Sequence, residues 1–424
     1  MTGRTLHIAW VGFPPSEEVG GVPGIATDLL HGLAALGHRI DCYFPGQPSE
    51  LPRRLAGLDS LTVLWAGGSW QWGRWYSRTR ITAFVSALVA NGLDSFRHRG
   101  ELQRRHRAEP YDFLYQFSNV ENLAIPRDVA RSVPLVAHPG QSSADALRFL
   151  LRERRLYLRS RPFYKFAVAA LVLWLRKRVQ RRKLRSAQLV ICISHVFREH
   201  LIRDYGISET ASVVVPNPVR VDRFVASERP CGNPARIIVL GRIATGKGVE
   251  DVVALAKLLR EREVAARVRL VGGTSMWSDY TALLAELPPE NAEYAGRIEA
   301  SLVPGELAES DVLLQASKYE AFALTVAEAL SAGVPVVATT EVGAIEQVDR
   351  SVAAAVAPGD VQGMQEAITA MLERLRDRPG ETRALARAEA ERLFAPEVVC
   401  GEISSALQAR AVVRRDVGAP DSGL

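Results

Sequence analysis

Cysteine is scarce in this sequence, and the side chains that bind metals are scattered. Among the 424 residues there are four cysteines, which lie far apart in the chain: Cys42, Cys192, Cys231 and Cys400. No CxxC pair or Cys/His cluster is present, so the sequence indicates neither a disulfide scaffold nor a zinc site. The segment HVFREH, with His195, Glu199 and His200, also lacks the spacing of a helical zinc motif.

Targeting signals and dinucleotide motifs are missing as well. The N-terminus, MTGRTLHIAWVGF, has no basic region followed by a long apolar stretch and a cleavage site, so it predicts a first strand and not a signal peptide. Scattered cysteines fit a reducing compartment, and we therefore expect a cytoplasmic protein. No G-x-G-x-x-G follows the first strand, which disfavours a nicotinamide dehydrogenase.

The net charge of +6 conceals a strong local excess of basic residues. Residues 148–185 contain 14 Lys/Arg and one acid, Glu153, whereas the rest of the chain carries 39 basic and 46 acidic residues. Charge concentrated in this way usually faces an anionic partner. The same segment holds ten consecutive apolar residues, Phe166–Leu175, which are too few to span a bilayer because that takes about 20.

Three interpretations of residues 148–185 remain open at this point. The segment can be a buried helix with solvated ends, or an element on an anionic membrane surface, to which each basic residue contributes roughly 1 kcal/mol. Nucleic acid is disfavoured because no recognisable nucleic-acid-binding fold surrounds the basic residues. A location at the inner face of the membrane is therefore the alternative to a freely diffusing protein.

The order of predicted elements indicates the α/β class. An apolar strand at 6–11, a Gly/Pro-rich loop, a helix with apolar residues at helical spacing over 25–36, and a strand at 39–44 form a β-loop-α-β unit. Further strands are predicted at 61–65, 113–117, 135–138 and 189–193, and a last short strand of this half at 213–215. A second α/β run begins with a strand at 237–240 and continues with strands at 268–271, 312–315 and 334–338. The pattern predicts two doubly wound domains facing across a cleft.

The turn-rich stretch RFVASERPCGNPA, which has little periodicity, is predicted to link the two domains. A last helix is expected to return to the first domain, and the tail from Asp416 is expected to be loose. The predicted division is a first domain at 1–224, a second domain at 225–395, and the returning helix with its tail at 396–424.

The most informative segment is SKYEAFALTVAEALSAGVPVVA, residues 317–338. It predicts a strand end, a loop with Glu320, and a helix over 324–331 with Glu328. The free N–H groups and the positive dipole end of that helix suit a diphosphate at the carboxyl edge of a parallel sheet. Two carboxylates eight residues apart would lie roughly 12 Å apart along a helix, so they would contact different parts of one elongated ligand.

The second segment is GRIATGKG, residues 241–248, directly after the strand at 237–240. It places Arg242 and Lys247 in a glycine-containing loop at a strand end. Arg binds phosphate in a fork and Lys supplies a point charge. Cations that act more strongly on a departing diphosphate than on the bound substrate lower the barrier of a transfer reaction.

These segments resemble the donor domain of the family 4 retaining glycosyltransferases, which have the GT-B fold of two Rossmann-like domains. The matching pieces are GRIATGKG, the Glu-x7-Glu pair Glu320/Glu328, AGVPVVAT at 332–339 and VGAIE at 342–346, with GGVPG at 20–24 and VPNPV at 215–219 upstream. The resemblance covers nearly the whole chain, apart from gaps around 65–110 and 148–186. The order and spacing of the motifs are together quite specific.

The resemblance implies a metal-independent enzyme that moves a sugar from a nucleotide-diphosphate sugar with retention of configuration. Arg242 and Lys247 would hold the diphosphate, Glu320 would contact the transferred sugar, and Glu328 the ribose. Backbone N–H groups of four residues would cradle sugar and phosphate: Phe322, Ala323, Leu324 and Thr325. The Gly20-Gly21 loop would close over the diphosphate, and His138 matches a position that faces the acceptor or the sugar.

No cofactor or metal is implied, and no Asp-x-Asp pair is present to hold one. The acceptor remains open among a glycan, a lipid-linked molecule and a small molecule. The segment WAGGSWQWGRWY offers Trp70, Trp72 and Trp75 as acceptor contacts, because aromatic rings stack on sugar faces; core packing is the alternative.

The chain departs from the family's pattern at several positions. It has Ala321, Ala323 and Ala344 where glycine is common, and Arg220 where an Asp is common. Methyl groups in the sugar pocket restrict a loop that glycine leaves free. Two alternative functions therefore stay open: a non-catalytic partner that binds a nucleotide sugar, and a nucleotide-sugar epimerase on the same fold.

Overall fold

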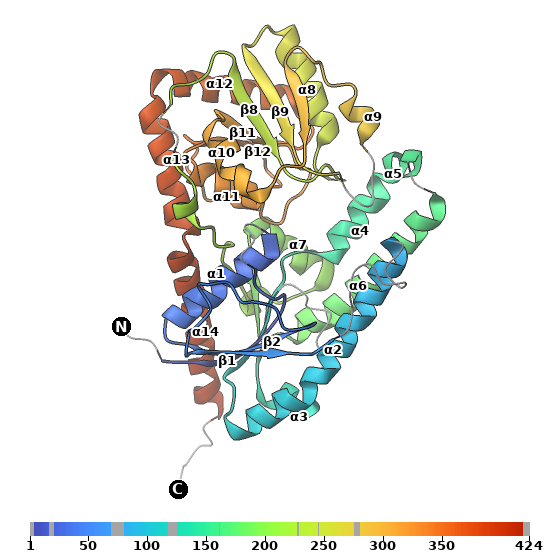
Figure 1. Cartoon of the computed structure of the whole chain (residues 1–424), viewed down its shortest axis with the longest axis vertical. Coiled ribbons are helices and arrows are strands. Elements are labelled where there is room, and N and C mark those ends of the chain that lie inside the picture. Colours follow the sequence, from blue (N-terminus) through green and yellow to red (C-terminus); the bar gives the residue numbers. More distant parts are fainter. Residues whose placement is uncertain are drawn as a thin grey trace.

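The computed structural model describes residues 4–16, 21–68, 80–117, 125–160, 162–226, 229–244, 246–274 and 280–418. Two parallel sheets organise these residues, one above the other in Figure 1. The central strands β5 Leu135–His138, β6 Leu189–Cys192 and β11 Val312–Gln315 are buried throughout and mostly apolar, as expected of a parallel sheet that is covered by helices on both faces.

The first sheet has the strand order β3-β2-β1-β4-β5-β6-β7, and all its paired neighbours run parallel. Its strands are β1 His7–Val11, β2 Arg39–Phe44, β3 Leu61–Trp65, β4 Phe113–Phe117, β5 Leu135–His138, β6 Leu189–Cys192 and β7 Ser212–Val214. Its helices are α1 Gly21–Ala35, α2 Arg80–Ala108, α3 Arg127–Ser132, α4 Ser143–Arg152, α5 Arg154–Ser160, α6 Phe163–Ser186 and α7 His195–Tyr205.

The second sheet has the order β10-β9-β8-β11-β12-β13 and is also parallel. Its strands are β8 Ala235–Leu240, β9 Ala266–Val271, β10 Ala292–Gly296, β11 Val312–Gln315, β12 Val336–Thr339 and β13 Ala353–Val356. The helices that follow are α8 Val249–Glu261, α9 Thr281–Leu284, α10 Val303–Ala308, α11 Leu324–Ser331, α12 Val361–Asp377, α13 Pro379–Phe394 and α14 Pro396–Gly418.

This architecture confirms the predicted α/β class with two doubly wound domains. In each sheet the strand order reverses beside the first strand of the domain, between β1 and β4 and between β8 and β11. Ligands of such sheets bind outside the carboxyl ends of the strands at this reversal. The chain passes from the first sheet to the second between Val214 and Ala235, the interval that contains the predicted linker.

The C-terminal helices connect the two domains along one side of the molecule (Figure 1). Helix α13 packs on α11 of the second domain, and α14 packs on α1 of the first. Val399, Cys400, Ile403 and Leu407 of α14 are fully buried in the core of the first domain. The close approach of α14 to α1 requires Gly32, because a Cβ there would lie 2.4 Å from Cys400 Sγ.

Helices α4, α5 and α6 lie on the opposite side of the molecule from α14 (Figure 1). They share a small core of their own around Leu150, Tyr157, Phe166 and Ala169. Among the described residues, no helix combines the length and the apolar character that crossing a bilayer requires.

Candidate functional site

A cavity of about 600 Å³ lies between the two domains, at the strand-order reversals of both sheets. The first domain contributes the start of α1, the end of β4 at Phe117, and parts of α4 and α6. The second domain contributes the loop after β8 and the loop from β11 into α11. The cavity is therefore where doubly wound sheets place their ligands.

The loop after β8 carries the two predicted cations. Arg242 is exposed at the cavity wall, and the Lys247 ammonium forms an ion pair with the Glu320 carboxylate. Gly248 follows with a φ of +66°, and a Cβ at this position would lie 2.0 Å from the Ala316 carbonyl oxygen. Only glycine allows this approach of the β8 loop to the end of β11, which brings Lys247 beside Glu320.

The loop that contains Glu320 is held by backbone hydrogen bonds to residues 341–344. The Glu320 N–H donates to the Glu341 carbonyl at 2.9 Å, and the Glu320 carbonyl accepts from Gly343 N–H at 3.0 Å. The Phe322 carbonyl accepts from Ala344 N–H at 2.8 Å. These bonds orient the Glu320 side chain toward the cavity, while the start of α11 presents its first-turn N–H groups there.

Ala323 occupies an unfavourable backbone conformation at the start of α11. Its φ is 76° and its ψ is 86°, in the left-handed region that a residue with a Cβ rarely adopts. Of the three alanines at positions where glycine is common, only Ala323 has a positive φ; Ala321 and Ala344 do not. The departure at Ala321 therefore places no backbone strain on the loop, whereas the departure at Ala323 does.

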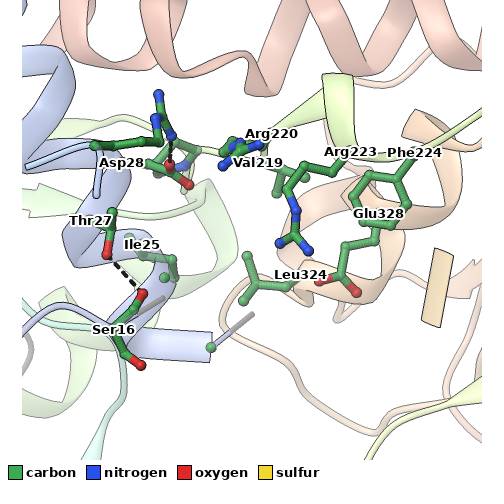
Figure 2. Close-up of a pocket in the computed structure, with 14 residues that line it drawn as sticks. Ser16, Ile25, Thr27, Asp28, Val219, Arg220, Arg223, Phe224, Leu324 and Glu328 are labelled. Carbon is green, nitrogen blue, oxygen red and sulfur yellow. Dashed lines mark hydrogen bonds and ion pairs between the residues drawn. The ribbon is translucent and has the colours of Figure 1, made fainter. Parts of the chain in front are cut away.

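Glu328 lines a smaller pocket of about 60 Å³ that adjoins the cavity and shares Gly21 and Leu324 with it. Figure 2 shows its carboxylate beside Leu324, with the Arg223 guanidinium pointing toward it. Burial raises the pKa of Glu328 to about 7, although the positive charge of Arg223 acts in the opposite direction. Near neutral pH this carboxyl is therefore present both in its ionised form, which only accepts hydrogen bonds, and in its protonated form, which can also donate one.

Further charged residues of this small pocket come from the first domain and the linker. Arg54 donates to Asp28 of α1 at 2.7 Å (Figure 2), and Arg220 lies close enough to lower the pKa of Asp28. Burial nevertheless raises the pKa of Asp28 to about 6. Arg220 occupies the position where the family commonly has an Asp, and in this chain it lies near the Asp28 carboxylate.

The first-domain wall of the cavity is formed by α4, α6 and the loop before α4. Gln141, Ser142 and Asp145 supply polar groups, and Phe149 supplies an aromatic ring. Ser142 caps α4 by accepting from Asp145 N–H at 3.1 Å. These side chains carry no recognisable sequence signal, because the position of a residue at the cavity wall depends on how the two domains face each other.

An aromatic stack joins the domains beside the cavity. The Tyr319 ring, next to Glu320, lies between Phe149 at 5.9 Å and His200 at 4.3 Å, with interplanar angles of 15° and 4°. Burial raises the pKa of Tyr319 above its usual range, so the phenol is neutral. An aromatic residue directly before Glu320 was the available sequence signal, but its two partners lie on α4 and α7.

Two sets of hydrogen bonds also hold the domains together. The Glu346 carboxylate accepts from the N–H groups of His195 and Val196 at 2.7 and 2.6 Å, at the start of α7. The Glu153 carboxylate, at the end of α4, accepts from Gly246 N–H and Tyr280 O–H, both at 2.7 Å. These contacts fix the second domain against α4 and α7 on both sides of the aromatic stack.

Asp145, His200 and Asp204 form one group with metal-ligand chemistry in the part of the chain that the structure describes. Arg148 donates to Asp145 and, at 2.7 Å, to both oxygens of Asp204. His200 Nδ1 lies 2.8 Å from Asp145. The guanidinium occupies the same oxygens that a cation would need, so we assign this group to the ion pairs that orient α4 against α7.

His138 is brought to the end of β5 but does not line the cavity. Its side chain is fully buried, and its Nδ1 lies 2.7 Å from the Tyr115 hydroxyl. The Phe117 ring packs edge-on against it at 5.2 Å, and this ring lines the cavity. Burial lowers the pKa of His138 to about 3, so the imidazole is neutral. A direct contact of His138 with a ligand would require the Phe117 ring to move.

The cavity brings together most of the residues that the sequence predicts for the donor. Eight of them line it, namely Gly21, Arg242, Lys247, Glu320, Phe322, Ala323, Leu324 and Thr325. Glu328 lines the adjoining pocket. Gly20, Trp70, Trp72 and Trp75 lie outside the described residues.

Comparisons with known proteins identify the family of the chain. Residues 19–223 match the family model described as Glycosyltransferase Family 4, and residues 222–387 match the model described as Glycosyl transferases group 1. Mannosylfructose-phosphate synthase of Agrobacterium fabrum is 28% identical over 177 residues, which cover 38% of this chain and 39% of that protein.

A second relative is MMP alpha-(1->4)-mannosyltransferase of Mycolicibacterium hassiacum, which is 29% identical over 245 residues, or 56% of this chain and 57% of that protein. The chain thus spans 39% to 57% of the length of these two curated relatives. The two regions of the chain are matched by different family models, which fits their division into two sheets.

Solved structures show the same fold over the whole chain. Sucrose-phosphate synthase from Thermosynechococcus elongatus has a TM-score of 0.67 at 16% identity and covers 97% of this chain and 100% of its own. Anabaena HepE in complex with UDP has a TM-score of 0.60 at 16% identity and covers 95% of this chain and 100% of its own. With both family models matched and the GT-B fold observed, the chain belongs to the family 4, group 1 glycosyltransferases.

Proposed function

We propose that this protein transfers a sugar from a nucleotide-diphosphate sugar to an acceptor, with retention of configuration and without a metal ion. The observation that carries the proposal is that Arg242, Lys247 and Glu320 line one interdomain cavity together with the start of α11. Cations and helix N–H groups suit a diphosphate, and a carboxylate beside them suits the hydroxyls of a sugar.

The second domain supplies the groups that act on the leaving group. A donor diphosphate near Arg242 would compete with Glu320 for the Lys247 ammonium, which would free the carboxylate to accept hydrogen bonds from the sugar. Charge that develops on the diphosphate as the glycosidic bond breaks would be stabilised by Arg242, Lys247 and the first N–H groups of α11. These groups provide the stabilisation that a divalent cation provides in other transferases.

The first domain supplies the acceptor side of the cavity. Gln141, Ser142 and Asp145 line the first-domain side of it. In a retaining transfer without a covalent intermediate, the acceptor hydroxyl approaches the anomeric carbon from the side that the diphosphate leaves. The bonds of Glu346 and Glu153 across the domain interface hold this arrangement closed, which limits attack by water.

Donor binding is tested first with a thermal-shift series of UDP-, GDP- and ADP-sugars. A ligand that binds the native state raises its melting temperature, so the correct nucleotide is expected to give the largest shift. UDP-glucose is the natural starting probe, because HepE, which shares the fold, has been solved in complex with it. No shift with any nucleotide sugar would contradict the proposal.

Transfer is then tested with Lys247→Ala and Glu320→Ala, each of which is expected to lower the rate at least about tenfold while the protein stays folded. Lys257→Ala is the matched control, because Lys257 also pairs with a glutamate, Glu286, at 3.0 Å but lies outside the cavity. Wild-type rates in both cavity variants would contradict the site assignment.

The same assays separate the two alternative functions. Donor binding with neither sugar transfer nor slow hydrolysis of the donor would favour the non-catalytic partner. Conversion of the donor sugar in the absence of an acceptor would favour the epimerase.

A further inference from the structure

Helix α6 exposes an unusual number of large apolar side chains. Six of them are between 42% and 68% exposed: Phe163, Tyr164, Leu171, Trp174, Leu175 and Val179. At 100° per residue, Leu171, Trp174 and Leu175 share the side of the helix opposite to Phe166, Ala169 and Gln180, which are buried. The apolar run is therefore not a buried helix with solvated ends, and that interpretation of the sequence is wrong.

The same outward side of α6 continues into basic residues. Arg178, Arg181, Arg182 and Arg185 are exposed on it, one to three turns beyond the apolar side chains. The Arg178 guanidinium lies over the Trp174 ring, 4.1 Å from its centroid. We call Phe163, Tyr164, Leu171, Trp174, Leu175 and Val179 with these four arginines the α6 outer surface.

The opposite side of α6 lines the interdomain cavity. Ala169, Val172, Leu173 and Arg176 form part of the cavity wall, across from the loop that contains Glu320. An α-helix with its side chains is about 10–12 Å across. Whatever covers the α6 outer surface is therefore about one helix diameter from the cavity. The part of the cavity wall that α6 forms is largely apolar.

We propose that the α6 outer surface binds an anionic phospholipid bilayer, and that the acceptor is an amphiphile carried in that bilayer. Exposed Trp and aliphatic side chains next to arginines match the interfacial region of a bilayer, where aromatic rings and apolar groups enter and basic residues meet anionic headgroups. The acceptor half of the proposal rests on the proposed function, because it assigns the lipid headgroup to the first-domain side of the cavity.

The charge of the molecule favours a bilayer over a second copy of the chain. Residues 148–185 carry 14 of the 53 basic residues and one acidic residue, so two copies of this surface would repel each other. A bilayer with anionic headgroups compensates this charge and accepts the apolar side chains at the same time. The stacked Arg178–Trp174 pair suits that boundary, since one group is cationic and the other amphipathic.

The test is co-sedimentation of the full chain with vesicles of equimolar phosphatidylglycerol and phosphatidylcholine. We expect binding that falls steeply between about 50 mM and about 500 mM salt, and little binding to phosphatidylcholine alone. Leu171→Glu/Trp174→Glu and, separately, Arg181→Glu/Arg182→Glu are each expected to lower the vesicle partition coefficient at least about tenfold.

Matched controls use equivalent residues elsewhere. Leu302→Glu places a charge on an apolar side chain that is 56% exposed in the second domain, and Arg262→Glu/Arg350→Glu removes the same amount of positive charge from exposed positions. Both controls are expected to bind vesicles within about twofold of wild type. Equal loss in the controls, salt-independent binding, or no binding would overturn the membrane proposal. So would a self-associated species that the α6 variants dissociate, because the surface would then be covered by a second copy.

The acceptor half is tested with the same variants and the active nucleotide sugar. If it is correct, the α6 variants lose transfer to vesicle-borne acceptors while the thermal shift produced by the donor stays unchanged. Unchanged transfer to such acceptors by variants that no longer bind vesicles would overturn it. A failure of the proposed function would give a different result from a failure of the acceptor half, because the nucleotide sugar would then produce no thermal shift in the wild-type protein either.

Discussion

Ala323 combines a positive φ with a side chain at the point where α11 begins. We expect Ala323→Gly to raise the free energy of unfolding by about 0.5–1 kcal/mol, because relief of left-handed strain outweighs the greater unfolded-state entropy of glycine. Urea titration measures the change. The neighbouring Ala321→Gly is the control and is expected to lower stability by a similar amount, since its φ is not positive. Equal effects of the two substitutions would contradict strain at Ala323.

Glu328 is expected to make donor affinity depend on pH near neutrality. Its pKa is raised to about 7, so the carboxylate that would accept ribose hydrogen bonds is lost as the pH falls through about 7. Affinity for the nucleotide sugar, measured by calorimetry between about pH 6 and about pH 8, is expected to rise several-fold with pH. A nucleotide sugar suits this experiment better than a free nucleotide, whose terminal phosphate titrates in the same range.

Glu328→Gln is the control for the pH dependence and is expected to flatten it. The contribution of Glu328 to the free energy of unfolding changes with pH in the opposite direction to its contribution to donor affinity. A folded-state pKa above the ordinary 4.5 makes a contribution to stability that is complete below about 4.5 and is lost as the pH rises through about 7. The glutamine variant is therefore expected to be at least as stable as wild type at alkaline pH. An unchanged pH profile of binding in Glu328→Gln would contradict the assignment.

At the scale of elements, the start of α7 depends on the other domain. Ser194 caps α7 by accepting from Phe197 N–H at 3.0 Å and donates to the Ala321 carbonyl at 2.7 Å. Gly343 permits this contact, because a Cβ there would lie 2.3 Å from Ser194 Oγ. The Glu346 carboxylate completes the cap from the second domain, so α7 and the loop that contains Glu320 are positioned together.

We expect Glu346→Gln to lower the free energy of unfolding by about 1–2 kcal/mol, because one amide oxygen replaces two carboxylate oxygens and the charge at the helix N-terminus is lost. Transfer is expected to fall with it, since the aromatic stack of Tyr319 depends on the same closure. Calorimetry and initial rates measure the two effects. Glu341→Gln is the control, since its carboxylate is 3.9 Å from His200 and makes no hydrogen bond to a helix terminus in the described part of the chain. Equal losses in both variants would argue against the cap.

The elements that the sequence predicted well are those with strong periodicity or flanking turn residues. The strands over 61–65, 113–117, 135–138 and 312–315 and the helix over 324–331 have the predicted bounds. By contrast, β10 and β13 were missed, because AEYAG and AAAV contain few residues with strand propensity. These strands form because the neighbouring strands β9 and β12 offer free edges. Strand β12 begins at Val336, two residues later than predicted, since Pro335 has no N–H to donate.

At the scale of the whole molecule, α14 couples the end of the chain to the first domain. Ile403 is fully buried and belongs to the same core cluster as side chains of α1. We expect Ile403→Ala to lower the free energy of unfolding by about 2–4 kcal/mol, because it removes apolar contacts and leaves a cavity. Urea titration followed by circular dichroism measures this. Val412→Ala, at a position that is 59% exposed on the same helix, is expected to change stability by less than about 0.5 kcal/mol. Similar losses in the two variants would show that α14 does not hold the first domain.

The second-domain side of the candidate site was predictable because it is local in sequence. Each of its segments follows a strand directly, and the carboxyl ends of β8 and β11 lie next to each other in the sheet. Arg242, Lys247 and Glu320 therefore converge once the second sheet forms. The first-domain side was not predictable in this way, since Gln141, Asp145 and Phe149 line the cavity only because the two domains dock on each other.

The two doubly wound domains and the glycosyltransferase motifs follow from local sequence, because strand and helix periodicity and glycine-containing loops act over a few residues. Three features depend on how distant parts of the chain pack: His138 lies behind Phe117, Tyr319 is held between Phe149 and His200, and α6 lines the cavity on one side and faces outward on the other. Burial and side-chain orientation result from contacts between residues far apart in the chain, which the local sequence pattern does not encode.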